Sequence, residues 1–199
     1  MSEPVVPHLA EPGRAHPEGN PAAQIGCSPS RRRQTGPVTG VRIQVAGRGE
    51  HLAEAATIWA EATAARDGAA EIAPPDLARP VIQRVTESSA RSFLLVALDG
   101  DDQIVGFAAI EPASSNESTA EIRYLGVQPG RWGGGIGRQL MLSLPGRLAA
   151  AGFTRGELDV YLDNPRATKL YEGLGWRPSG NATPHPRSGR LEQRYQIDL

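Results

Sequence analysis

The residues best suited to hold a ligand lie in one corner of the sequence, where an apolar run meets a glycine-rich turn. Residues 120–127 have the composition of a strand, and the turn after them contains Gly133, Gly134, Gly135 and Gly137 before an apolar helix pattern begins. The first N–H groups of a helix lack intrahelical partners and carry partial positive charge, and glycines let an anion approach them closely. This corner therefore predicts a diphosphate site built from backbone groups.

Two common glycine motifs do not match this corner. A P-loop requires a lysine directly after its last glycine, but Arg138 follows Gly137. A dinucleotide-binding fingerprint requires Gly-x-Gly-x-x-Gly after the first strand of a βαβ unit, and this spacing is also absent. A diphosphate at this corner is therefore expected to belong to a ligand other than a P-loop nucleotide or a dinucleotide cofactor.

The spacing Val127-x-Pro129, followed by Gly133-x-Gly135-Ile136-Gly137-Arg138, resembles the acetyl-coenzyme A loop of the GNAT superfamily of N-acyltransferases. Downstream, residues 164–176 are similar to that family's Asn-x-x-Ala-x-x-x-Tyr-x-x-x-Gly-Phe signature, with Trp176 in place of the phenylalanine. The resemblance covers residues 41–199. It implies a mixed α/β fold with a central, mostly antiparallel sheet flanked by helices.

The resemblance also implies acetyl-coenzyme A as co-substrate and assigns its contacts. In the family the end of the strand before the loop grips the thioester and pantetheine through its backbone. The family usually has Arg or Gln where this chain has Trp132, so Arg131 or Arg138 is expected to supply the missing charge. The expected cofactor-binding residues are Leu125, Gly126, Val127, Trp132, Gly133, Gly134, Gly135, Ile136, Gly137, Arg138 and Asn164.

Transfer of an acetyl group from a thioester to an amine needs a base for the amine, oxyanion donors and an acid for the departing thiolate. Tyr171 follows Asn164 by about two helical turns, so both face one side, and the family's matching tyrosine lies near the sulfur. Tyr171 is the expected acid, with a core tyrosine as the alternative. Asn164 is alternatively a simple helix cap. Glu121 is the expected base, with an ion pair to Arg123 as the alternative.

These residues together predict transfer of an acetyl group from acetyl-coenzyme A to a primary amine of a small molecule, by direct attack in a ternary complex. One alternative is acetylation of a protein amine. Another is a catalytically silent acyl-coenzyme A sensor. Release of coenzyme A thiol with a panel of amines would separate the sensor from the enzymes.

The elements that must position these residues follow from periodicity and from turn residues. The predicted order is β-αα-βββ-α-β-α-β. Gly100 is expected to supply a positive φ in a hairpin turn, and Pro145 to kink or break a helix near Leu144. The predicted strands are residues 41–45, 92–98, 103–111, 120–127, 157–162 and 191–199; the predicted helices are 50–65, 76–89, one starting near 136, and 165–174; polar loops are expected at 112–118 and 178–189.

Composition limits the remaining function classes. The 199 residues carry a net charge of -1, which argues against nucleic acid as a partner, and no apolar run is long enough to span a membrane. Residues 1–39, rich in proline and glycine and including Arg31–Arg33, are expected to form a disordered tail before a domain at residues 40–199. Cys27 is the only cysteine and no histidines pair at metal-ligand spacing, so neither disulfide nor metal is expected. We expect a soluble, cytoplasmic protein. The sequence does not fix the oligomeric state, and a homodimer is one of the alternatives.

Overall fold

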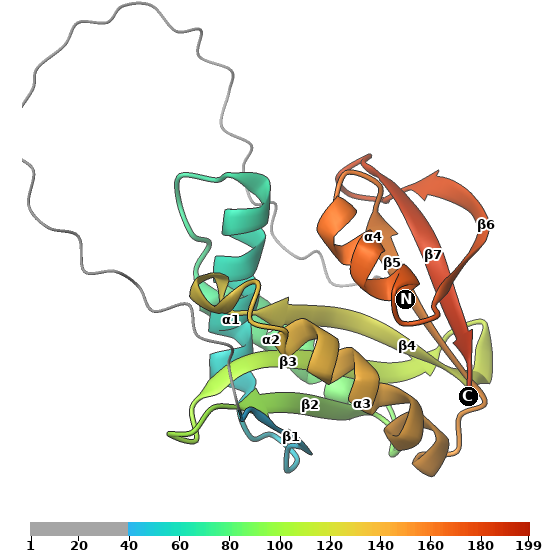
Figure 1. Ribbon diagram of the computed structural model, residues 1–199, viewed down its shortest axis with the longest axis horizontal. Coiled ribbons are helices and arrows are strands. Elements are labelled where there is room, and N and C mark those ends of the chain that lie inside the picture. The colour runs from blue at the N-terminus through green and yellow to red at the C-terminus, as the bar shows by residue number, and fades with distance from the viewer. Residues whose placement is uncertain (1–39) are drawn as a thin grey trace, which may run out of the picture. The chain divides into compact units, whose positions relative to one another are not determined.

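The structure is a computed structural model and describes residues 40–199; the expected tail lies outside this range. The chain has helices on both sides of a central sheet (Figure 1). In chain order its elements are β1 (Arg42–Val45), α1 (Leu52–Asp67), α2 (Pro75–Glu87), β2 (Phe93–Leu98), β3 (Ile104–Ala113), β4 (Asn116–Val127), the 3₁₀ helix η1 (Pro129–Arg131), α3 (Ile136–Ala150), β5 (Arg155–Tyr161), α4 (Pro165–Glu172), β6 (Arg177–Pro184) and β7 (Leu191–Asp198).

The strands form one sheet in the order β1-β2-β3-β4-β5-β7-β6. Neighbouring strands are antiparallel except β4 and β5, which are parallel and pair only through residues 119–121 and 155–157. The rest of β4, residues 122–127, has no strand partner on its β5 side. Figure 1 shows the two strands diverging from this short junction. We call the region between residues 122–127 of β4 and residues 158–161 of β5, where no strand pairing joins the two, the wedge.

A β-bulge in β4 lies just beyond this junction. The pairing with β3 moves from Ile110 opposite Ile122 to Ala109 opposite Tyr124, so that Arg123 is an extra residue. A bulge bends its strand and increases the local twist. It therefore helps to turn the end of β4 away from β5.

Successive apolar side chains of β2 point to opposite faces of the sheet, so each face has an apolar surface that helices cover. Leu95 and Ala97 face one apolar cluster, and Leu94 and Val96 face the other. The first cluster lies under α3 and α4, and the second under α1 and α2. The first includes Leu140, Leu144, Leu148, Leu158, Tyr171 and Trp176, and the second includes Ile58, Ile82, Val85, Phe107 and Ala109.

The break expected in α3 was wrong, because the helix runs without interruption through Pro145 to Ala150. Proline removes one intrahelical hydrogen bond, but Leu144 and Leu148 on either side of it are fully buried. Arg147 also ties this part of the helix to β1 through a 2.9 Å hydrogen bond from its Nη2 to the carbonyl of Ile43. Packing on both sides of the proline maintains the helix.

The chain has one strand more than the expected order, because most of the expected 178–189 loop forms β6. This strand contains Pro178 and Pro184 and lies at the sheet edge, where only one side pairs. Proline is tolerated at such edges because no ladder bond is lost on the open side. The turn-like composition of the segment therefore concealed a strand.

Two turns also differ from expectation. Between β2 and β3 the positive φ belongs to Asp102 (56°) and not to Gly100, and the Asp99 carboxylate accepts the N–H groups of Asp101 and Gln103. Aspartate tolerates this conformation better than most residues, and a side-chain-bonded turn supports it. The expected 112–118 loop is a short turn, since β3 extends to Ala113 and β4 begins at Asn116.

Candidate active site

The glycine corner has the geometry expected of an anion site. Gly133 and Gly135 have φ of 86° and 83°, in the left-handed region, and a Cβ on either would meet open space. No side chain caps the start of α3, which leaves the N–H groups of Ile136, Gly137 and Arg138 without intrahelical partners. The corner therefore combines free donors, the positive end of a helix and an unobstructed approach.

Gly126 is required by packing, whereas Gly137 has room for a Cβ in ordinary contact with its neighbours. A Cβ on Gly126 would lie 2.6 Å from Cε1 of Phe107, so a larger residue would displace this ring of the second apolar cluster. A Cβ on Gly137 would lie 3.6 Å from Leu170 of α4 and 3.7 Å from Val127. Gly137 thus lies where β4, α3 and α4 meet, at one end of the wedge.

The open edge of β4 offers main-chain groups to a ligand, but one of them is already bonded. Leu125 and Val127 pack toward the first apolar cluster, and Tyr124 faces Trp59 of α1 with ring centroids 5.7 Å apart. The indole Nε1 of Trp132 donates a 2.7 Å hydrogen bond to the carbonyl of Val127. A carbonyl oxygen has two lone pairs, so the Val127 carbonyl has one left for a pantetheine amide.

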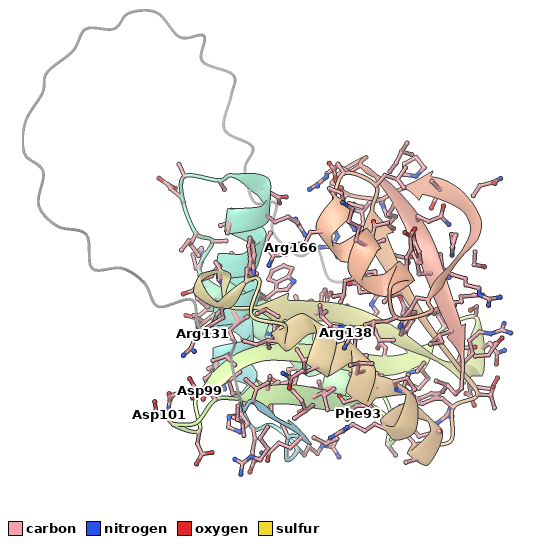
Figure 2. The ribbon with its side chains drawn as sticks, viewed as in Figure 1. Phe93, Asp99, Asp101, Arg131, Arg138 and Arg166 are labelled. Atoms are coloured by element: carbon pink, nitrogen blue, oxygen red, sulfur yellow. The ribbon has the colours of Figure 1, made fainter. Side chains whose placement is uncertain are left out.

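Of the arginines expected to supply charge at the corner, Arg131 is bound elsewhere. Its Nη2 lies 2.9 Å from Asp99 at the β2–β3 turn (Figure 2). Arg138 is exposed on the first turn of α3. A third arginine, which the sequence did not indicate, approaches from α4: the guanidinium of Arg166 lies 4.9 Å from the centre of the Trp132 ring.

The sequence placed Asn164 and Tyr171 on one helix face, and the structure gives them different surroundings. Asn164 is the N-cap of α4, and its Oδ1 accepts the N–H of Ala167 at 3.2 Å. Tyr171 is buried between the rings of Trp176 and Tyr195, with centroids 6.4 and 6.3 Å away. Burial raises the pKa of Tyr171 to about 12. The structure thus shows the cap bond of Asn164, and Tyr171 is buried and retains its proton at neutral pH. The expected roles of both residues toward the co-substrate stay predictions.

Glu121 forms the ion pair that the sequence left as an alternative. Its Oε1 lies 2.6 Å from Nη1 of Arg123. The Nε of the same arginine lies 3.2 Å from Oε1 of Glu111. Burial opposes the charged form of Arg123, but the charge and hydrogen bond of Glu121 raise its pKa overall. Glu121 is therefore held in place within a charged network at the narrow end of the wedge.

Sequence reasoning missed Glu157, the register partner of Glu121 across the parallel junction. Glu157 is 4% exposed and lies 3.4 Å from Nη1 of Arg194, which also pairs with Asp159 at 2.8 Å. These carboxylates raise the pKa of Arg194, against the effect of burial. Both glutamates alternate with residues of the first apolar cluster, so they point to the opposite face from α3 and α4.

A second polar cluster joins the end of α1 to the β5 side of the wedge. Arg190 lies 2.9 Å from Asp67 and 2.6 Å from Asp163, and its guanidinium stacks 4.1 Å from the centre of the Tyr161 ring. Hydrogen bonds from arginine lower the pKa of both aspartates, with Arg66 the main partner of Asp67 and Arg190 that of Asp163. We call Asp67, Tyr161, Asp163 and Arg190 the clasp.

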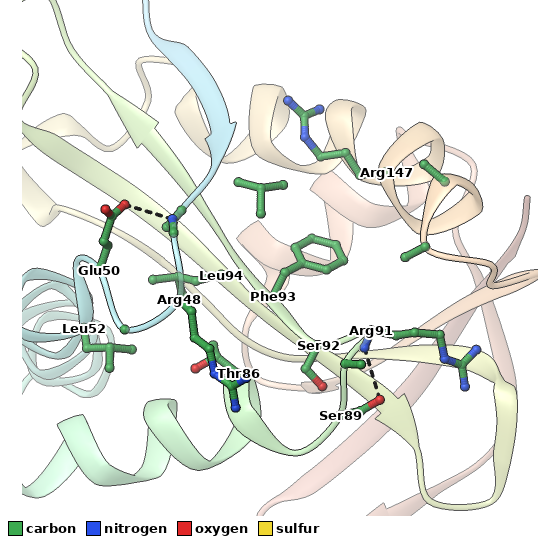
Figure 3. A pocket seen from close by; sticks show the side chains of 17 residues that line it. Arg48, Glu50, Leu52, Thr86, Ser89, Arg91, Ser92, Phe93, Leu94 and Arg147 are labelled. Atoms are coloured by element: carbon green, nitrogen blue, oxygen red, sulfur yellow. Dashed lines mark hydrogen bonds between the residues drawn. The ribbon is translucent and has the colours of Figure 1, made fainter.

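One hollow within residues 40–199 lies away from the wedge. It measures about 550 Å³ and lies between β1, the end of α2 and the end of α3, where Arg48, Arg91 and Arg147 contribute side chains (Figure 3). The three guanidinium groups point away from one another, and Arg147 is bonded to backbone carbonyls. A second hollow of about 440 Å³ lies between the C-terminal end of α1, the segment after it and η1.

Two expected absences can be examined within residues 40–199. No group of three or more histidine, cysteine or acidic side chains in this range is arranged to hold a metal ion. In the same range, no helix is both long enough and apolar enough to cross a membrane.

A mixed sheet whose central parallel strands separate beside an uncapped, glycine-led helix defines a class of protein that binds a phosphate-bearing carrier through backbone groups. The family model for the acetyltransferase (GNAT) family matches residues 70–176, which is more than half of the sequence. The chain belongs to the GNAT family. Members of this family take their acetyl group from acetyl-coenzyme A.

Individual relatives match a smaller part of their own length. A mycothiol acetyltransferase from Actinosynnema mirum is 35% identical over 82 residues, 41% of this chain and 27% of the relative. The chain thus spans about a quarter of that relative's length.

Solved structures share the fold at low identity. A protein from Salmonella typhimurium, described as an acetyltransferase and solved with its cofactor acetyl-coenzyme A, has a TM-score of 0.59 and 20% identity, over 80% of this chain and 94% of that one. The ribosomal-protein-S18-alanine N-acetyltransferase from Escherichia coli has a TM-score of 0.61 and 18% identity over the same shares.

Proposed function

We propose that this protein transfers an acetyl group from acetyl-coenzyme A to a primary amine of a small molecule, by direct attack in a ternary complex. The observation that carries the proposal is the wedge. Its α3–α4 side has the free backbone donors of the glycine corner, and its opposite side has the buried carboxylates Glu121 and Glu157. An acyl donor and an amine can thus approach the wedge from opposite faces.

The corner and the β4 edge would hold the co-substrate, which supplies a reactive acetyl thioester. The N–H groups of Ile136, Gly137 and Arg138 face the diphosphate in this arrangement, with Gly133 and Gly135 leaving room for it. The backbone of Leu125 and Val127 is available along the open edge for amide groups, and the Val127 carbonyl can accept a second hydrogen bond beside that from Trp132. Asn164 is engaged as a cap through Oδ1, which leaves its amide nitrogen to donate.

Glu121 and Glu157 would take the proton that the amine must lose. An alkylamine with a reference pKa near that of lysine, about 10.4, arrives protonated at neutral pH. Glu121 lies four residues before Leu125, about 13 Å along an extended strand, so a proton would pass through water to the carboxylate. The paired arginines keep both carboxylates in fixed positions.

Tyr171 would act on the departing sulfur as a hydrogen-bond donor. Its pKa of about 12 exceeds that of a thiol, about 8.5, so complete proton transfer would be unfavourable by about 5 kcal/mol. A hydrogen bond stabilises developing negative charge without that cost. This role replaces the complete proton transfer expected from the sequence.

The clasp supports a small acceptor rather than a protein chain. It bridges the end of α1 and the β5–α4 connection on the acceptor side of the wedge, which limits the space there. The partial relatives are named for a small molecule, mycothiol. The fold alone does not distinguish a small-molecule acceptor from a protein acceptor. The Escherichia coli neighbour is named for acetylation of a ribosomal protein.

One observation favours the silent sensor as a second candidate: both candidate bases, Glu121 and Glu157, are engaged by arginines. Incubation with acetyl-coenzyme A and a library of small amines, followed by thiol detection and mass spectrometry of the products, tests both. The enzyme proposal predicts amine-dependent thiol release and an amine heavier by one acetyl group. Tight binding of acetyl-coenzyme A without turnover of any amine would support the sensor, and acetylation of peptides alone would overturn the small-molecule acceptor.

A further inference from the structure

The contact between Trp132 and Arg166 joins the two sides of the wedge. Trp132 follows η1 on the β4 side, and Arg166 is the second residue of α4 on the β5 side. The guanidinium lies 4.9 Å from the ring centre, and Figure 2 shows Arg166 extending from α4 toward the glycine corner. A ligand that runs from this corner into the wedge must pass the contact.

Arg166 differs from Arg131, the arginine of η1 beside the corner, in what holds it. Arg131 is paired with Asp99, but none of the ion pairs between residues 40–199 includes Arg166. The Arg166 guanidinium contacts the face of the Trp132 ring, and the side chains of both residues reach solvent. A cation–π contact at an exposed site is weak, and a charge-assisted hydrogen bond to a phosphate is stronger. Arg166 is therefore free to change partners when an anion arrives.

We propose that Arg166 is a phosphate ligand of the acyl carrier, and that the Trp132 ring holds its guanidinium in the free protein. On binding, the guanidinium leaves the indole and donates to the diphosphate at the glycine corner. The planar fork of arginine suits two phosphate oxygens at once. The proposal rests on the placement of the carrier at this corner and not on turnover of any amine.

Binding of three ligands to the full chain tests the proposal: coenzyme A, dephospho-coenzyme A, which lacks only the 3′-phosphate, and pantetheine, which lacks all phosphates. Affinities are measured by calorimetry, or by NMR titration where binding is weak. Arg166→Gln should lower affinity for coenzyme A and dephospho-coenzyme A by about ten- to a hundredfold and leave pantetheine unchanged. Arg166→Lys should recover part of the loss. Arg177→Gln, which removes an exposed cation from β6, is the matched control and should bind all three ligands normally.

Each other outcome overturns the proposal. An equal loss for pantetheine would mean that Arg166 acts through the structure of α4. No loss for any ligand would remove Arg166 from the site. A loss confined to coenzyme A would assign Arg166 to the 3′-phosphate and overturn the diphosphate assignment. Absence of coenzyme A binding to the unaltered chain would be a different result, since it would contradict the cofactor corner itself.

Tryptophan fluorescence gives a readout that does not depend on affinity alone. Trp132 is 36% exposed, and Trp176 is buried in the first apolar cluster. Saturation with coenzyme A should change the emission as the cation leaves the ring. Trp59, partly buried beside Tyr124 of β4, also emits, so the change should be smaller in Trp132→Phe and much reduced in Arg166→Gln at saturating ligand. A full change in Arg166→Gln would show that the emission does not report movement of Arg166.

Discussion

Glu121 and Glu157 are register partners at the last residue pair that joins β4 to β5, so two buried carboxylates stand side by side where the strands separate. Like charges at such positions destabilise a sheet unless they are compensated. Arg123 compensates the first and Arg194 the second. The arrangement places fixed negative charge at the narrow end of the wedge, on the side where an amine would enter.

Neutralising Glu121 tests its role in proton removal. Glu121→Gln should lower kcat by about ten- to a hundredfold, because a general base contributes at least this much and Glu157 remains beside it. Stability should change little, since Arg123 keeps Glu111 as a partner. Steady-state kinetics and chemical denaturation measure both effects. Glu117→Gln, an exposed change on the same strand, is the control. An unchanged kcat with chemistry rate-limiting would remove Glu121 from the mechanism.

Removing the Tyr171 hydroxyl tests the donor role without disturbing the core. Burial is the one cause of its raised pKa, and no buried side-chain oxygen or nitrogen in residues 40–199 lacks a hydrogen-bond partner. Tyr171→Phe should therefore fold normally and bind coenzyme A with unchanged affinity, while kcat falls by about a hundredfold. Single-turnover rates and calorimetry provide the two measurements. Equal losses in binding and rate would mean that Tyr171 only shapes the site.

Alkaline titration provides an independent test of Tyr171 burial. In the unfolded chain a tyrosine ionises near pH 10, but in the folded protein Tyr171 does so near 12. Below pH 10 both states keep the proton, so the stability is fully present. As pH rises from 10 to 12, only the unfolded state ionises, and the free energy of unfolding should fall by about 2 to 3 kcal/mol. Urea denaturation at pH 8 and 11 should show a smaller fall for Tyr171→Phe. Identical falls would contradict the burial.

The sequence could predict the glycine corner because its determinants are local. A strand, a glycine turn and a helix start follow one another, and residues 120–138 are sufficient to describe them. The cap at Asn164 and the antiparallel hairpin of β2 and β3 were correct for the same reason. The family motifs supplied the mostly antiparallel sheet with flanking helices, which the structure confirms.

What could not be predicted depends on contacts between distant segments. Glu157 acquires its position from the register of β5 against β4, and nothing in its own neighbourhood of the sequence shows that register. The clasp draws its residues from α1, β5, the connection after β5 and the connection between β6 and β7. The local rule that proline breaks a helix failed at Pro145, because core packing maintains α3 there. The strand β6 was missed because pairing at a sheet edge tolerates its prolines.

Opening the clasp should affect the acceptor and not the acyl carrier. Arg190 holds Asp67 and Asp163 together on the acceptor side of the wedge. Arg190→Gln should raise KM for the amine by about two- to fivefold, with coenzyme A affinity unchanged, because exposed ion pairs of this kind position a side chain only weakly. Initial-rate kinetics with each substrate varied separate the two effects. Arg155→Gln, which removes an exposed pair with Asp198, is the control. A matching loss of coenzyme A affinity would show that the clasp supports the whole wedge.

A charged side chain at the glycine corner tests the placement of the diphosphate. Gly135→Glu would put a carboxylate beside the free N–H groups of α3 and should abolish detectable coenzyme A binding. Any residue other than glycine at this φ of 83° also strains the backbone, by about 1 to 2 kcal/mol. Gly68→Glu controls for this strain, since Gly68 has φ of 65°, open space at its Cβ and a place at the end of α1. Both variants should lose similar stability in thermal unfolding, but Gly68→Glu should keep its affinity in calorimetry. Normal coenzyme A binding by Gly135→Glu would mean that the diphosphate lies elsewhere.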